Sequence, residues 1–112
     1  MKKGEIYLAK LNPTKGSEIS KVRPVVIFQS NYLKDLPTII VIPLTTHLRD
    51  NWFPLRVRIK KRGKLEKDSD AVIEQIRAID KSRIIGNPIG SLSEDEIELI
   101  EEAISFVLGI EE

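Results

Sequence analysis

Short apolar segments recur along the chain from residue 4 to residue 89, and they predict β-strands. In some of them apolar and polar residues alternate, and in others nearly every residue is apolar. Both patterns are typical of strands, whose side chains point alternately to the two faces of a sheet. Turns and charged loops, such as the loop from Gly63 to Asp70, separate them. The expected strands cover residues 4–11, 24–30, 38–45, 55–62 and 71–79, followed by a short strand or extended arm at 84–89.

The last part of the chain follows a helical period instead. Apolar residues from Ile97 to Leu108 recur at helical spacing, and Gly109 ends the pattern. Ser93, with Glu96 three residues later, forms the capping box that starts a helix. Five or six short strands followed by one amphipathic helix predict a mainly β fold, a small bent sheet or barrel covered on one side by that helix.

Length and composition predict a single domain, residues 1–112, without metal or cofactor. No linker or repeat divides the chain, and the absence of cysteine excludes disulfides and thiolate metal sites. His47 is the only histidine, and no glycine-rich phosphate loop precedes a helix, which argues against zinc and nucleotide triphosphates. No segment resembles a signal peptide or a membrane span, so we expect a cytoplasmic protein that does not enter a membrane.

The net charge of +1 conceals an uneven distribution along the chain. Residues 1–62 contain thirteen Lys and Arg against four Asp and Glu, whereas residues 63–112 contain five against thirteen. A solvated surface with its acids on the terminal helix explains this pattern. A basic face offered to a polyanion explains it equally well. Charge alone leaves both interpretations open.

Reactive side chains gather where the predicted strands begin and end. Arg23 precedes the apolar run of the second strand, Thr45 ends the third, and Glu18 lies in the loop between the first two. A guanidinium binds two oxygens of a phosphodiester, a hydroxyl donates to the same group, and a carboxylate can act as a general base. Structural roles explain the same residues, since Glu18 and Arg23 can form a local ion pair and threonine commonly ends a strand.

The predicted strand at 55–62 presents a basic face. Arg56 and Arg58 alternate with apolar residues, so their side chains share the polar side of the strand. Such a face can hold the backbone of a nucleic acid, with an affinity that falls as the salt concentration rises. Aromatic side chains in loops either stack on bases or cap the core, and this choice stays open for Tyr32, Trp52 and Phe53.

Four segments carry a resemblance to a known family. They are GEIYLAKLNPTKGSEISKVRPVVI at 4–27, IPLTT at 42–46, DSDAVIEQIRAIDKSRI at 68–84 and IGSLSEDEIELIEEAISFVLGI at 89–110. In this order they resemble the MazF/PemK (Kid-like) toxins of type II toxin–antitoxin systems. The resemblance implies an SH3-like barrel of five to six strands with a C-terminal helix, assembled as a homodimer.

The resemblance also implies an activity and partners. Members of this family are metal-independent endoribonucleases that cut single-stranded RNA, often mRNA, at short sequences. Attack by the 2′-hydroxyl on the adjacent phosphate leaves a 2′,3′-cyclic phosphate and a 5′-hydroxyl. An antitoxin with an acidic, disordered C-terminal segment neutralises the toxin.

The resemblance carries functional roles to particular positions of this chain. It implies that Arg23 and Thr45 are catalytic, and that Glu18 is the loop acid implicated in some relatives. Certain Kid-like members have a further arginine where this chain has Val72. From the resemblance and from side-chain chemistry, the residues expected to contact RNA are Ser17, Lys21, Thr46, Arg56, Arg58, Glu74 and Gln75.

Two other functions fit the same fold. A non-catalytic SH3-like module would bind nucleic acid through the basic face without cutting it. A toxin of the same fold that poisons DNA gyrase relies on a Trp-Gly-Ile ending. This chain has Leu108-Gly109-Ile110 there, and its only tryptophan is Trp52.

Overall fold

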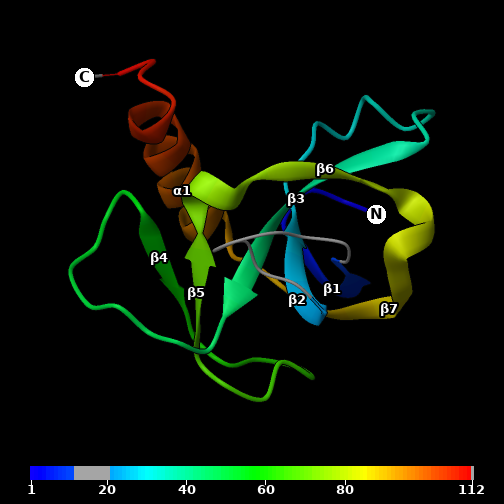
Figure 1. Ribbon diagram of the computed structural model, residues 1–112, viewed down its shortest axis with the longest axis horizontal. Helices are drawn as coiled ribbons and strands as arrows, with labels where there is room; N and C mark the ends of the chain where they lie inside the picture. Colours follow the sequence, from blue (N-terminus) through cyan, green and yellow to red (C-terminus); the bar gives the residue numbers. More distant parts are fainter. Residues whose placement is uncertain (12–20, 112) are drawn as a thin grey trace.

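The computed structural model describes residues 1–11 and 21–111. This part of the chain forms seven antiparallel strands, two short 3-10 turns and one C-terminal helix (Figure 1). The 3-10 turns are η1 (Ile73–Gln75) and η2 (Lys81–Arg83), and the helix is α1 (Glu94–Val107). The strands are β1 (Glu5–Lys10), β2 (Val22–Ile27), β3 (Thr38–Thr45), β4 (Arg56–Ile59), β5 (Ser69–Val72), β6 (Arg77–Asp80) and β7 (Ile84–Ser91).

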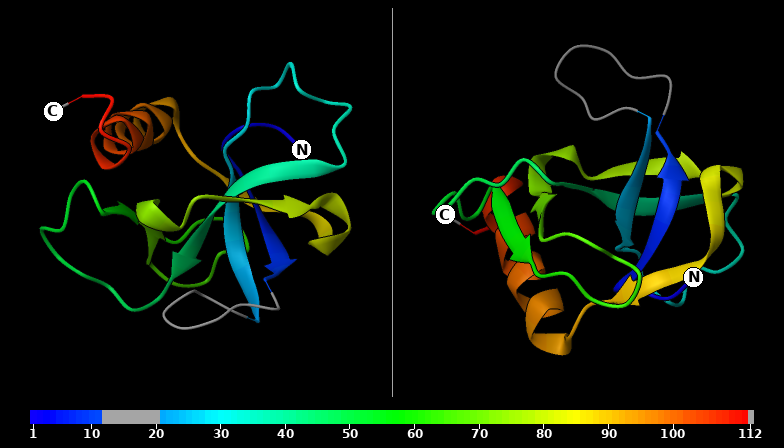
Figure 2. Two further views of the ribbon diagram at one scale, coloured as in Figure 1. Left: turned by 45° about the horizontal axis from the view of Figure 1, so that its top comes forward. Right: turned by 90° about the horizontal axis from the view of Figure 1, so that it is seen from below.

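Strand β3 is common to the two halves of the fold. The strands run in the order β4-β5-β3-β2-β1-β7, and β6 pairs with β3 as well. The first half of β3 pairs with β6, and its last two residues pair with β5. The curved sheet that results leaves α1 beside β4 and η1 (Figures 1 and 2).

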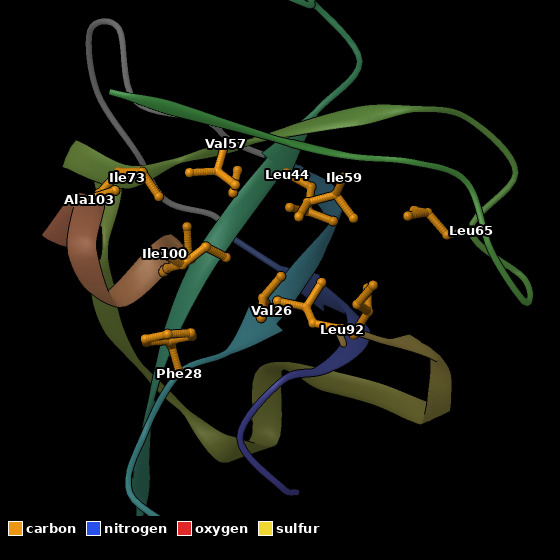
Figure 3. Packing of buried hydrophobic residues seen from close by; sticks show 13 residues of the cluster. Val26, Phe28, Leu44, Val57, Ile59, Leu65, Ile73, Leu92, Ile100 and Ala103 are labelled. Carbon is orange, nitrogen blue, oxygen red and sulfur yellow. The ribbon is translucent and has the colours of Figure 1, made fainter. Parts of the chain in front are cut away.

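Two apolar clusters cover opposite faces of β1, β2 and β3. Alternate residues of a strand point to opposite faces, so Val25 and Ile27 belong to one cluster while Val26 and Phe28 belong to the other. The cluster that contains Val26 also receives Ile100 and Ala103 of α1 and side chains of β4 and β5 (Figure 3). This packing fixes the helix against the sheet.

The structure confirms the mainly β fold and its C-terminal helix. The capping box of Ser93 and Glu96 is present, because the Ser93 hydroxyl accepts from the Glu96 N–H and the Glu96 carboxylate accepts from the Ser93 N–H. No helix among the described residues is long and apolar enough to cross a membrane.

Two details of the predicted sheet are wrong. There are seven strands instead of five or six, and their hydrogen-bonded order does not close into a complete barrel. Within the described residues, β6 and β7 are joined by η2 without pairing. On the other side, the Lys64 N–H donates to the Ile89 carbonyl at 2.7 Å and Arg62 Nη1 donates to the Ser91 carbonyl at 3.3 Å, and these bonds join β7 to the turn after β4.

The predicted strand at 71–79 is interrupted. Leu44 lies opposite Ala71 and Val41 lies opposite Arg77, so the five residues 72–76 on one side face the two residues 42–43 on the other. The turn η1 accommodates the three extra residues and buries Ile73. The expected charged loop from Gly63 to Asp70 is also too long, since β5 already begins at Ser69.

An ion pair joins the turn after β4 to the first turn of α1. The Arg62 guanidinium binds both carboxylate oxygens of Glu96, with 2.7 Å between Nη2 and Oε2. Partial burial alone would raise the pKa of Glu96, but hydrogen bonds from Arg62 and from the Ser93 backbone lower it below the ordinary value of 4.5. The charged form of Glu96 is therefore stabilised by folding.

Replacing Glu96 by glutamine is expected to lower the free energy of unfolding by about 1 kcal/mol at neutral pH. Glutamine preserves the capping box, so the change removes only the ion pair. A lowered pKa stabilises the fold above the unfolded value of 4.5, and this contribution is lost as the pH falls through the folded value. The difference in melting temperature between the two proteins should then disappear in acid. Glu98→Gln, on the exposed side of α1, is the control and should match the wild type at every pH.

Candidate active site

A row of polar side chains crosses three neighbouring strands. Thr45 of β3 lies opposite Asp70 of β5, and Asp70 lies opposite Arg58 of β4. Directly opposed residues of antiparallel strands point to the same face. Their sequence neighbours Leu44 and Ala71 point to the other face, into the cluster that holds α1. The row therefore lies on the face of the sheet away from the helix.

Arg23 lies near the end of this row. On β2 it is opposite Ala9 of β1. On the other side of β2, Val25 lies opposite Pro43 of β3, and this register continued by two residues sets Arg23 opposite Thr45. By this extension the two residues belong to facing ends of adjacent strands, and their catalytic roles stay a prediction.

The Arg23 side chain has an unused donor. It is half-buried, and its Nε atom is buried without a hydrogen-bond partner among the described residues. A buried donor without a partner costs about 1–3 kcal/mol. An oxygen atom of a ligand would recover that free energy.

The Thr45 hydroxyl is held in place by the turn that follows it. Its Oγ1 atom accepts a hydrogen bond from the His47 N–H at 3.2 Å. A hydroxyl that accepts in this way keeps its own hydrogen for donation. Thr45 can therefore donate to a ligand oxygen beside Arg23.

Asp70 is a buried acidic residue of this row that the sequence analysis does not single out. Its side chain is only 1% exposed, and it accepts from the Arg49 N–H at 2.7 Å and from Arg58 Nε at 2.6 Å. Arg56 Nη1 lies 3.3 Å from the same carboxylate. The sequence does contain a signal for it: Asp70 is an acidic residue directly before the apolar run that begins at Ala71, and a neighbouring predicted strand carries the alternating Arg56 and Arg58.

Arg56 and Arg58 are ion-paired instead of projecting freely from the basic face. Arg58 binds Asp70 and, through Nη2, the exposed Asp50 at 2.7 Å. Hydrogen bonds to Asp70 and then to Asp50 raise the pKa of Arg58. Arg56 donates to the His47 carbonyl at 3.0 Å as well as to Asp70. Their predicted contact with RNA stays a prediction.

A groove of about 520 Å³ lies beside this network, lined among others by Trp52, Arg58 and Asp70. The Trp52 ring is half-exposed and lies 5.4 Å from the guanidinium of Arg49 and 5.7 Å from that of Arg56. Phe53 differs, because its ring meets Phe106 of α1 edge-on at 6.3 Å between centroids. Both rings line the groove, and among the described residues that of Trp52 is the one that lies beside cations.

Comparison with known proteins identifies the family. Residues 2–108 match the family described as PemK-like, MazF-like toxin of type II toxin-antitoxin system. The chain belongs to this family. The resemblance inferred from the four sequence segments is thereby confirmed.

Individual relatives of the MazF family cover nearly the whole chain. Endoribonuclease MazF of Staphylococcus saprophyticus is 39% identical, over 98% of this chain and 92% of the relative. The Mycobacterium tuberculosis toxin MazF-mt6 has a TM-score of 0.79 at 23% identity, covering 96% of this chain and 99% of that one. An endoribonuclease in complex with its cognate antitoxin from Mycobacterial species has a TM-score of 0.75 at 19% identity, covering 98% and 96%. These two structures show that the fold is shared.

The other residues predicted to act in this candidate site lie around it where the structure describes them. Thr46 follows β3 and is exposed, and Lys21 lies just before β2. Glu74 is exposed and Gln75 is half-buried, and both belong to η1 instead of a strand. Ser17 and Glu18 lie outside the described residues. In the part of the chain that the structure describes, no group of three or more His, Cys, Asp or Glu residues is placed to hold a metal ion.

Proposed function

We propose that this chain is a sequence-specific, metal-independent endoribonuclease toxin that cleaves single-stranded RNA, chiefly mRNA, in the cytoplasm. The observation that supports the proposal is the β2–β3 register, whose continuation by two residues brings Arg23 opposite Thr45, together with an Arg23 Nε atom that has no partner among the described residues. Membership of the MazF family and the 39% identity to a protein named as an endoribonuclease support the same activity.

The proposed reaction is an internal transesterification. The 2′-oxygen attacks the adjacent phosphorus and the bond from phosphorus to the 5′-oxygen breaks, giving a 2′,3′-cyclic phosphate and a 5′-hydroxyl after proton transfer to the leaving oxygen. Arg23 stabilises the charge that grows on the phosphorane oxygens, and Thr45 donates to one of them. Donors fixed in advance at such positions are each worth about 3–4 kcal/mol. Glu18 is the proposed acceptor of the 2′ proton. DNA lacks the attacking group and should survive.

The remaining polar residues would bind the substrate around this centre. Single-stranded RNA is recognised through unstacked bases, which side chains contact by hydrogen bonds and stacking. Lys21, Arg56 and Arg58 supply positive charge, and Trp52 supplies a ring for stacking. The proposed hydrogen-bonding contacts come from Ser17, Thr46, Glu74 and Gln75.

The proposed partners follow from the family and from the charge distribution. An antitoxin with an acidic, disordered C-terminal segment would be attracted to the basic residues of the first 62 positions and would order as it binds. A protein of the same fold is described in complex with its cognate antitoxin. We also propose that two copies of the chain assemble as a homodimer.

The proposed activity is tested by incubating the purified protein with a long in-vitro-transcribed RNA in EDTA and mapping the new ends. Discrete cuts with 5′-hydroxyl and 2′,3′-cyclic phosphate ends are expected, and a DNA copy of the same sequence should stay intact. RNA that is retained but uncut would instead identify a binding module. Cutting that requires added magnesium would contradict the metal-independent mechanism.

A further inference from the structure

The buried carboxylate of Asp70 calls for an explanation beyond stability. A buried ion pair gains little free energy over apolar residues of similar size, because two charges must leave water. Asp70 lies in a strand whose following residues, Ala71 and Val72, are buried and apolar. The buried charge of Asp70 is therefore expected to orient neighbouring groups more than to stabilise the fold.

The contacts of Asp70 converge on the turn that follows Thr45. One carboxylate oxygen accepts directly from the Arg49 N–H at 2.7 Å. The same oxygen lies 3.3 Å from Arg56 Nη1, and Arg56 Nη1 in turn donates to the His47 carbonyl at 3.0 Å. Asp70 thus holds the turn at two points, directly at the Arg49 N–H and through Arg56 at the His47 carbonyl.

His47 connects this network to the proposed catalytic hydroxyl. Its carbonyl is held by Arg56, and its N–H donates to Thr45 Oγ1 at 3.2 Å. Asp70 also lies directly opposite Thr45 across β3 and β5. The position of the Thr45 hydroxyl is therefore coupled to Asp70 both through the turn and across the sheet.

We propose that Asp70 is a positioning residue of the ribonuclease site, which fixes the turn at residues 46–49 so that the Thr45 hydroxyl faces the scissile phosphate. The inference rests on the proposed function, because it assigns Asp70 a role in the reaction of Thr45. Asp70 touches neither substrate nor reacting atoms in this scheme. It acts through Arg56, the Arg49 backbone and His47.

Replacing Asp70 by asparagine keeps the size of the side chain and removes its charge. We expect kcat to fall about tenfold to a hundredfold, the range produced when a reacting group is slightly displaced. KM should stay within about a factor of two, since a displaced hydroxyl affects the transition state more than ground-state binding. The measurement uses a short RNA spanning a cut site mapped in the long RNA. A change in KM alone would overturn the proposal.

Asp50→Asn is the matched control. It removes the same charge from a partner of the same Arg58, but its side chain is 81% exposed and makes no contact with the turn among the bonds described above. Its kcat should equal that of the wild type. If Asp70→Asn fails to fold, Arg56→Met is the alternative variant. It removes the bond to the His47 carbonyl and leaves the ion pair between Asp70 and Arg58 in place, so its kcat should fall by the same factor. Unchanged kcat in a folded Asp70→Asn or Arg56→Met protein would refute the positioning role.

A double-mutant cycle separates this inference from the proposed function. Thr45→Val removes the hydroxyl and keeps the branched shape. If Asp70 acts through that hydroxyl, adding Asp70→Asn to Thr45→Val should lower kcat no further. If the two substitutions instead lower kcat by the product of their separate factors, the positioning role of Asp70 is overturned, while the proposed ribonuclease activity is unaffected. Full kcat in Thr45→Val alone would overturn the proposed catalytic role of Thr45, and the inference with it.

Discussion

Replacing Arg23 by alanine is expected to reduce RNA cleavage by about a thousandfold while the fold remains intact. The β2–β3 register, continued by two residues beyond Val25 and Pro43, sets Arg23 opposite Thr45, and the buried Nε atom of Arg23 has no partner among the described residues. Loss of the guanidinium removes the donors that would meet the phosphorane oxygens. The initial rate on a mapped RNA site measures the effect, and circular dichroism with thermal unfolding checks the fold.

Two further variants show which property of Arg23 matters. Arg23→Lys keeps the charge but loses the planar pair of donors, so its activity should fall between those of the wild type and Arg23→Ala. Lys34→Ala removes a charge from an exposed residue between β2 and β3, at the opposite end of these strands, and should cleave normally. Normal cleavage by Arg23→Ala would remove the chemical basis of the proposed mechanism.

The sequence predicted the elements better than it predicted how they pair. Hydrophobic period and the Ser93 capping box are local signals, and both correspond to observed elements. The interruption at η1 depends on which part of β3 each neighbouring strand joins. That is a property of the whole sheet, which no window of the sequence contains.

The candidate site shows the same division. Arg23 precedes one predicted strand and Thr45 ends another, and such positions are visible in the sequence; their catalytic roles are implied by the family resemblance. Asp70 was assigned to a charged loop, since the first two residues of β5 are polar. Its burial arises from its opposition to both Thr45 and Arg58, and this is visible only once three strands are in register.

Ion pairs between the two halves of the chain explain part of the uneven charge distribution. Lys3 binds Glu101 at 2.6 Å, Arg62 binds Glu96, and Arg58 binds Asp70. In each pair the cation comes from the first 62 residues and the acid from the rest. Some of the basic residues therefore also stabilise the fold, so the surplus of positive charge in the first 62 residues does not measure the charge offered to a polyanion.

Replacing Ile100 by alanine is expected to lower the free energy of unfolding by about 2–5 kcal/mol. Ile100 is fully buried in the cluster that joins α1 to the sheet, so its truncation leaves a cavity at the only helix of the described residues (Figure 3). Because a domain is typically stable by about 5–15 kcal/mol, this loss should be large enough to shift a urea-unfolding midpoint strongly.

The neighbouring Leu99 provides the matched control. Leu99→Ala removes as many carbon atoms from the same helix, but its side chain is 42% exposed, so it should lose far less stability than Ile100→Ala. If Leu99 belonged to the interface of the proposed homodimer, the stability lost in Leu99→Ala would shrink on dilution, whereas the Ile100 effect is set within one chain. Equal, concentration-independent losses in the two variants would contradict the packing of α1 described above.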